Sequence, residues 1–72
     1  MTTRAAGNRR RLTNDEVIDV RDRLLAKGDI STAPVHDQEL FRDCDRALGV
    51  VRCRQEEREA ARERILLAVT AL

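Results

Sequence analysis

The last third of the chain is the feature that most limits what this protein can fold into. Residues 50–72 contain no glycine or proline and are rich in Ala, Glu, Arg and Leu, which are strong helix formers. The first half of this stretch is highly charged, and the second half is almost entirely apolar. We therefore expect one long helix from about residue 51 to residue 71.

The apolar residues of this expected helix indicate how it packs. On a helical wheel, one side of this helix has the spacing of a buried face. That side consists of Ala61, Ile65, Ala68 and Leu72, with Val69 beside them. Leu66 and Leu67 lie off that line, so the last two turns are apolar nearly all round. The apolar run is nevertheless shorter than the roughly 20 residues that span a bilayer. We predict a partner contact surface at this end, formed by Ile65, Leu66, Leu67 and Val69.

The charged half of the same helix carries three arginines at intervals of four residues. Arg54, Arg58 and Arg62 form this arginine row. Like charges at this spacing repel each other, so the row suggests an acidic neighbour. It is either a docking surface for an acidic helix or a phosphate backbone, or a solvated face whose arginine stems cover the core. If it is a docking surface, replacing all three arginines by Glu should weaken partner binding and leave the helical content unchanged.

A first helix is predicted over about residues 14–27. Thr13 and Glu16 have the spacing of a capping box, and Leu12 and Val17 have the spacing of a hydrophobic staple. Gly28 is typical of the residue that ends a helix. The helix thus has a start signal and a stop signal in the sequence.

The charged residues of this first helix predict one specific contact. Arg21 lies in the middle of its apolar face, and a buried arginine without a partner is costly. We therefore expect Arg21 to pair with Asp43 or Asp45. An acidic stripe on the opposite side, formed by Asp15, Asp19 and Asp22, could pair with the arginine row within one chain, between two chains, or not at all.

A middle helix is predicted over about residues 38–48. Asp37 is a suitable N-cap, and Gly49 is expected to end the helix, or else to lie within one long bent rod. The apolar stripe of this helix consists of Leu40, Cys44, Ala47, Leu48 and Val51. Cys44 stands at the centre of the stripe, so we expect a buried core thiol.

These patterns predict a small all-α, three-helix domain over residues 12–72, preceded by a flexible basic arm over residues 1–11. With no Trp or Tyr and one Phe, the core must be aliphatic. A domain of this size buries only about 60% of its unfolded surface, so a partner or a second copy could supply further burial. The arm is either a solubilising tail or a contact for phosphates or an acidic protein surface, through Arg9, Arg10 and Arg11.

Charge and cysteine usage limit the class of protein. The net charge of +1 comprises +4 in the arm and −3 in the remainder, which is not the strongly basic domain usual for nucleic-acid binding. Arginine is used almost to the exclusion of lysine, which suggests a GC-rich genome. The two cysteines do not form a CxxC motif, and no apolar run begins the chain. We expect a reduced, cytoplasmic protein without a membrane span.

The sequence offers little for catalysis or for cofactor binding. His36 is the only histidine and Ser31 the only serine, and no spacing argument joins His36 to a cysteine nucleophile. A metal site built from His36, Cys44 and Cys53 would lack the paired short spacings of structural zinc sites. We expect neither an enzyme nor a metal or cofactor site.

One segment resembles a known DNA-binding pattern. Residues 40–54, LFRDCDRALGVVRCR, are similar to the helix-turn-helix family, in which an apolar helix ends at a glycine turn and a recognition helix follows, as at ALGVVR. The resemblance implies contact with DNA. The chain departs from the pattern where apolar anchors are needed, at Gln55 and Arg58, and nearby glutamates would oppose a phosphate backbone.

Two classes of function follow from the sequence. The first is a small non-enzymatic regulator of phage or bacterial origin that binds a larger bacterial machine, for which the transcription apparatus is one candidate. The alternative is a dimeric helix-turn-helix-like DNA-binding protein that uses the basic arm. Binding to DNA that weakens steeply with salt and prefers one sequence would favour the alternative.

Overall fold

A computed structural model describes residues 11–70 of the chain. Three α-helices, α2 Asn14–Ala26, α3 Val35–Leu48 and α4 Gln55–Thr70, are accompanied by a short 3-10 helix, η1 Ile30–Thr32. The predicted small all-α, three-helix domain is confirmed. The predicted arm falls mainly on residues 1–10 and so lies outside the described residues. Within the described range, no helix has both the length and the apolar character that a membrane span requires.

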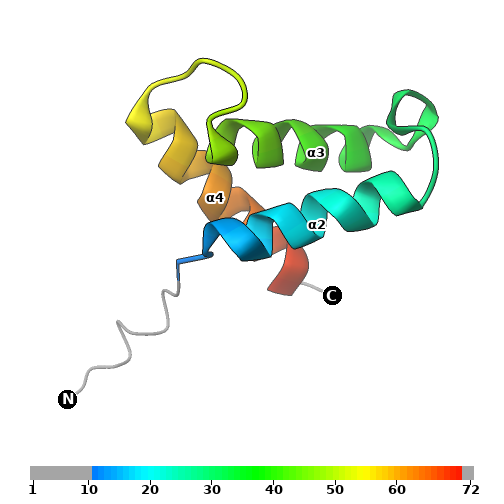
Figure 1. Ribbon diagram of the computed structural model, residues 1–72, viewed down its shortest axis with the longest axis horizontal. Coiled ribbons are helices and arrows are strands. Elements are labelled where there is room, and N and C mark those ends of the chain that lie inside the picture. Colours follow the sequence, from blue (N-terminus) through cyan, green and yellow to red (C-terminus); the bar gives the residue numbers. More distant parts are fainter. Residues whose placement is uncertain (1–10, 71–72) are drawn as a thin grey trace.

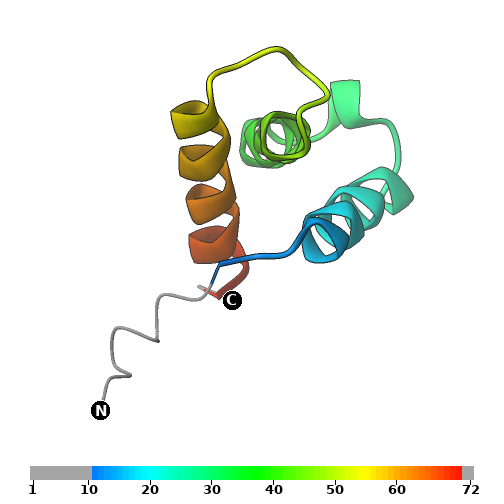
Figure 2. The ribbon, with the colours of Figure 1, turned by 60° about the vertical axis from the view of Figure 1, so that its left-hand side comes forward.

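The helices form a hairpin with a third helix across one end. In Figure 1, α2 and α3 run in opposite directions and are joined through η1. Helix α4 crosses the end of the pair where α2 begins and α3 finishes (Figure 2). Helix α3 lies in the middle of the fold, because it packs against both α2 and α4.

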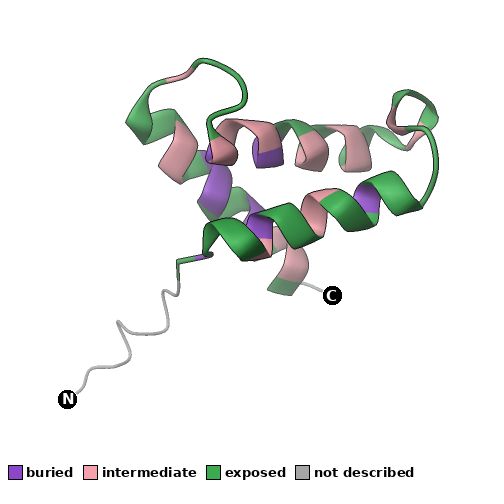
Figure 3. Ribbon diagram, in the orientation of Figure 1, coloured by how far each residue is buried: buried purple, intermediate pink, exposed green. Residues whose placement is uncertain are grey.

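The core is small and aliphatic, as expected. Buried residues line the faces that the helices turn toward each other (Figure 3). Buried apolar surface stabilises a fold by about 25 cal/mol per Å². Because few side chains are buried here, the free energy of unfolding is expected to be small. The central cluster consists of Leu12, Val17, Cys44, Ala47, Ala61 and Ile65, with partly buried Val20, Leu40, Leu48, Leu66 and Val69 packed against it.

Helix α2 begins as its sequence predicts. The backbone N–H of Glu16 donates to Thr13 Oγ1 over 3.2 Å, and the backbone N–H of Thr13 donates to Glu16 Oε1 over 2.9 Å. This reciprocal capping box satisfies two N–H groups that the first turn leaves unpaired. Leu12 and Val17 on either side of it both enter the core. The predicted start is confirmed, and the helix ends at Ala26, one residue before the predicted end.

Helix α3 begins three residues earlier than predicted. Pro34 is its N-cap and Val35 its first residue, so the prediction of Asp37 as the N-cap is wrong. Asp37 lies instead in the first turn, where a carboxylate suits the positive end of the helix dipole. It also pairs with Lys27 over 3.6 Å. Pro34 explains the early start, because its missing N–H is one that a helix start leaves unpaired anyway.

Helix α4 begins at Gln55, so the prediction of a continuous helix from residue 51 is wrong at its start. Gly49 ends α3 with φ of 77°, a left-handed conformation that glycine adopts without strain. Val50 and Val51 follow in an exposed loop, so Val51 does not belong to the α3 stripe. The loop ends where the backbone N–H of Arg54 donates to Glu57 Oε1 over 2.8 Å.

Two buried or half-buried ion pairs fix the helices relative to each other. Arg21 donates to Asp45 Oδ1 over 3.0 Å, which confirms one of its two predicted partners, and its guanidinium lies 4.9 Å from the centre of the Phe41 ring. Asp43, the other candidate, is buried and accepts two hydrogen bonds from Arg64 of α4, of 2.8 and 3.0 Å. Asp43 therefore connects α3 to α4.

The two cysteines differ in chemical reactivity. Cys44 is fully buried, and burial, followed by the nearby carboxylates of Asp45 and Asp43, raises its pKa to about 11. Its thiol therefore keeps its proton well above neutral pH, and the thiolate is the reactive form. Cys53 is partly exposed in the loop before α4, where its thiol donates to the carbonyl oxygen of Arg46 over 3.7 Å.

We expect iodoacetamide at pH 8 to modify Cys53 in the folded protein and to leave Cys44 unmodified until denaturant is added. Peptide mass spectrometry of samples quenched over time would measure both sites. Because the pKa of Cys44 is raised on folding, its contribution to stability is present below the ordinary thiol pKa and is lost as the pH rises toward 11. Equal rates at the two sites in native buffer would contradict a closed core around Cys44.

Candidate binding groove

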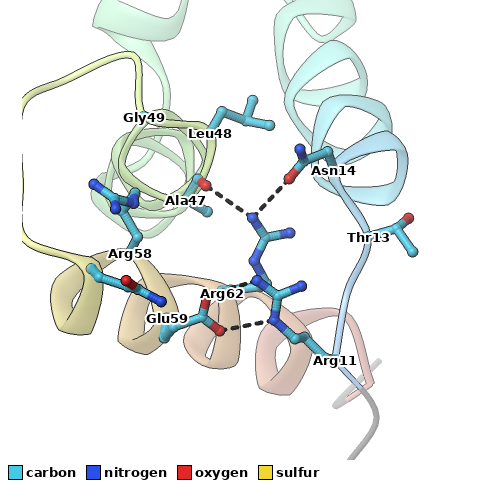
Figure 4. A pocket seen from close by; sticks show the side chains of 10 residues that line it. Arg11, Thr13, Asn14, Ala47, Leu48, Gly49, Arg58, Glu59 and Arg62 are labelled. Atoms are coloured by element: carbon cyan, nitrogen blue, oxygen red, sulfur yellow. Dashed lines mark hydrogen bonds and ion pairs between the residues drawn. The ribbon is translucent and has the colours of Figure 1, made fainter.

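An open groove of about 600 Å³ lies where the start of α2, the end of α3 and the first turns of α4 meet. Figure 4 shows Arg62 at its centre, with side chains from all three helices around it. The position follows from the fold, because α4 crosses the open end of the α2–α3 hairpin. The groove is lined by Arg11, Thr13, Asn14, Ala47, Leu48, Gly49, Gln55, Arg58, Glu59 and Arg62.

Arg62 forms the floor of the groove and is only 5% exposed. Its guanidinium donates to the carbonyl oxygen of Leu12 over 2.7 Å, to that of Ala47 over 2.9 Å and to Asn14 Oδ1 over 2.8 Å. These oxygens come from the segment before α2, the last turn of α3 and the start of α2. One side chain thus joins three parts of the fold, and it satisfies a carbonyl that the end of α3 leaves unpaired.

The charge of Arg62 has no carboxylate in ion-pair contact within residues 11–70. All three of its hydrogen-bond acceptors are neutral oxygens, and its buried Nε has no hydrogen-bond partner. Burial lowers the pKa of Arg62, and the nearby Arg11 lowers it further, whereas Glu59 raises it. A buried guanidinium nevertheless remains charged, because arginine is not deprotonated in proteins near neutral pH. The floor of the groove therefore carries a positive charge that takes part in no ion pair within residues 11–70.

Arg11 and Glu59 form an ion pair at the mouth of the groove. Arg11 Nε donates to Glu59 Oε1 over 2.9 Å, and Nη2 donates to Oε2 over 2.7 Å, a bidentate geometry. These hydrogen bonds are the main cause that lowers the pKa of Glu59. Both side chains are substantially exposed to solvent, so the pair remains accessible from outside.

Arg58 is the second cation of the groove that forms no ion pair with a carboxylate in the described residues. It is partly buried in the groove wall, and its Nη1 donates to the carbonyl oxygen of Cys53 over 2.8 Å. In the part of the chain that the structure describes, no carboxylate forms an ion pair with it. Most donors of its guanidinium therefore remain available to a ligand.

The charge of the groove contrasts with that of the domain as a whole. Residues 1–10 contain three of the fourteen cationic residues and none of the thirteen acidic ones, so residues 11–70 carry a net charge of −2. The groove nevertheless contains three arginines and one glutamate, a net charge of +2. Because Arg11 and Glu59 neutralise each other, the excess charge resides on Arg58 and Arg62. The arrangement is suited to binding an anionic group.

The structure separates the members of the predicted arginine row. Arg54 is exposed in the loop before α4 and does not line the groove. Arg62 is buried and lies beneath the groove rather than on an open surface, and its part in binding a partner stays a prediction. The structure instead groups Arg58 and Arg62 with Arg11 of the predicted arm. Arg9 and Arg10 lie outside the described residues.

The predicted apolar contact surface is also divided. Ile65 is fully buried in the core, so the structure gives it a packing role, and its contact with a partner stays a prediction. Leu66 and Val69 are partly buried against the core. Leu67 is 64% exposed. Of the four residues, Leu67 offers the largest exposed fraction to a partner.

Sequence reasoning missed Asn14 and Glu59 as members of the site. A signal for the burial of Arg62 was nevertheless present, because Arg58, Arg62, Ile65 and Val69 follow at i, i+4, i+7 and i+11, which is the spacing of one helix face. No comparable local pattern connects Asn14 with Arg62, or Glu59 with Arg11, because each pair is separated by 48 residues of chain.

Nothing in residues 11–70 gathers three His, Cys, Asp or Glu side chains in a way that could hold a metal ion. His36 lies in the first turn of α3, whereas the groove lies beyond the opposite end of that helix. Comparison of the chain with protein-family models, curated proteins and solved structures finds no match.

Proposed function

We propose that this protein is a small non-enzymatic regulator that binds a larger protein, and that the groove at the open end of the helical hairpin receives an acidic part of that partner. The observation that carries the proposal is the pair of groove-lining arginines, Arg58 and Arg62. Within the described residues, neither of them forms an ion pair with a carboxylate. The transcription apparatus is one candidate host, because such a machine would present both protein and nucleic acid to an arginine-rich arm.

The surroundings of the groove favour a protein partner over a nucleic acid. Leu48 lines the groove, and Val50 next to Gly49 is 64% exposed. These two apolar side chains beside the charged groove suit a peptide that carries both acidic and apolar side chains. Glu56, Glu57 and Glu59 lie on the first turns of α4, where they would repel a continuous phosphate backbone.

The alternative, a dimeric helix-turn-helix-like DNA-binding protein, draws its support from the basic arm. Against it stands the connection between α3 and α4, which spans residues 49–54. A helix-turn-helix usually joins its helices by three or four residues. The glutamates at the start of α4 also occupy the turn that a recognition helix directs toward base edges.

We expect Arg58→Glu to abolish capture of a partner that the unmodified protein retains from a lysate of its host. The substitution places a carboxylate where an acidic group should bind, and like charges across an interface are strongly unfavourable. Quantitative mass spectrometry of proteins captured on the immobilised chain would measure the loss, with circular dichroism to check that the variant is folded.

Arg42→Glu provides the matched control. Arg42 is exposed on α3 and takes no part in the groove, so the same reversal of charge there should leave capture unchanged. Equal capture by both variants would contradict the groove as the binding site. Tight, sequence-selective binding to duplex DNA near physiological salt, without a captured protein, would favour the DNA-binding alternative.

A further inference from the structure

The ion pair at the mouth of the groove suggests how an acidic partner enters, an inference that rests on the proposed function. Glu59 is the only carboxylate among the groove-lining residues. It is held by Arg11, whose guanidinium it engages in a bidentate pair. A carboxylate approaching Arg58 and Arg62 from solvent must therefore pass a like charge already at the entrance.

The two residues of this pair differ in how they are anchored. Glu59 lies on α4, whereas Arg11 lies outside the helices, in the segment before α2 and two residues ahead of its N-cap Thr13. Its guanidinium forms hydrogen bonds only to Glu59 within residues 11–70. Arg11 can therefore exchange one carboxylate for another without breaking a further side-chain contact.

We infer that Glu59 occupies the position of the partner's carboxylate in the unbound protein, and that an acidic peptide with an apolar side chain displaces it from Arg11. In the bound state, Arg11 and Arg58 hold the incoming carboxylate, while Arg62 contributes positive potential from the floor. Leu48 and Val50 contact the apolar side chain of the peptide. The Arg11–Glu59 pair then competes with the partner and sets the affinity.

This exchange can be tested with a short fluorescent peptide in which Glu and Leu alternate. Its dissociation constant should be measured by anisotropy for the unmodified protein and for Glu59→Gln. Removing the competing carboxylate should tighten binding by about threefold or more, whereas Arg58→Gln should weaken it by about fivefold. Affinity should also decline with added salt, since the contacts are ionic and reachable by solvent.

A matched variant separates exchange from a general change in charge. Glu56→Gln removes the same charge from the exposed first turn of α4, but Glu56 neither lines the groove nor contacts Arg11. The exchange predicts that Glu56→Gln changes affinity much less than Glu59→Gln. Equal tightening in the two variants would overturn it, because net charge would then explain the effect.

The arginine side chains give a direct signal that does not depend on affinity. In NMR spectra of labelled protein, the Nε–Hε resonances of Arg11 and Arg58 should shift as the Glu–Leu peptide is added. That of Arg42 should remain unchanged. An Arg11 signal that stays constant while Arg58 responds would overturn the exchange and leave the groove as the binding site.

Two further outcomes distinguish this inference from the proposed function. If a captured partner is lost in Arg58→Glu and binds Glu59→Gln more weakly than the unmodified protein, the proposed function stands and the exchange is wrong. If a peptide of alternating Gln and Leu binds as well as the Glu–Leu peptide, or single-stranded DNA binds the groove more tightly, an acidic peptide is the wrong occupant and both proposals fail.

Discussion

Replacing Arg62 by Glu should unfold the domain. The guanidinium of Arg62 donates to two backbone carbonyl oxygens and to the side-chain oxygen of Asn14, all in a buried setting. The carboxylate oxygens of a glutamate would face these three acceptor oxygens without a hydrogen to donate. The substitution would also place a negative charge in a buried position. A hydrogen bond to a charged group contributes about 1.5–3 kcal/mol, and three would be lost together, whereas a domain of this size has a total stability of about 3–9 kcal/mol.

Circular dichroism at 222 nm and thermal melting would measure the effect. The charge-matched control is again Arg42→Glu, which alters an exposed side chain on α3 and should shift the free energy of unfolding by no more than about 0.5 kcal/mol. Arg62→Gln keeps an amide donor and should fall between the two. Native helicity and an unchanged melting temperature in Arg62→Glu would show that the hydrogen bonds of Arg62 do not support the fold.

This expectation revises the test that the sequence suggested for the arginine row. If the whole row were an open docking surface, exchange of Arg54, Arg58 and Arg62 together for Glu would weaken binding and leave helicity intact. With Arg62 buried, the triple variant should lose its fold, and the loss of partner binding would then have no specific meaning. Arg58→Glu alone is the informative change.

Replacing Ile65 by Ala should be the second large loss of stability. Ile65 is fully buried at the centre of the core cluster. Truncating a buried isoleucine costs about 2–5 kcal/mol, because both burial and close packing are lost. In a domain of this length, each kcal/mol lowers the melting temperature by about 4–8 °C, so a fall of at least about 8 °C is expected.

Leu67→Ala is the control on the same helix, only two residues away. Leu67 is 64% exposed, so the substitution should change the free energy of unfolding by no more than about 0.5 kcal/mol. Chemical denaturation followed by circular dichroism would compare the two variants. If Leu67→Ala were as damaging as Ile65→Ala, the burial assigned to the two faces of α4 would be incorrect.

Local patterns determined much of the fold. The capping box of Thr13 and Glu16 involves residues three apart, so the start of α2 could be identified from the sequence. Gly49 likewise marks the end of α3, since only glycine adopts a left-handed conformation there without strain. The central position of Cys44 follows from apolar residues that recur at helical spacing. Each of these features depends on neighbours within about one or two turns of helix.

The first residues of α3 and α4 were less predictable. Asp37 is a good N-cap by residue type, but Pro34 starts the helix earlier. Residues 50–54 contain no glycine or proline and could have been helical. The left-handed turn at Gly49 instead directs the chain away from α3. Helix α4 then begins after Arg54, whose backbone N–H donates to Glu57 Oε1.

The sequence by itself determined that the chain forms three helices around an aliphatic core, because helix formation and apolar periodicity depend on residues close together in the chain. Only the tertiary structure decided the role of each arginine. Arg58 and Arg62 carry the same charge one turn apart, but the crossing of α4 over the end of the hairpin places Arg62 against the carbonyl oxygens of Leu12 and Ala47. Arg62 is buried by hydrogen-bond partners that lie about 15 to 50 residues away in the chain, and no local pattern contains this information. These distant contacts make Arg62 a structural cation and leave Arg58 able to bind a ligand.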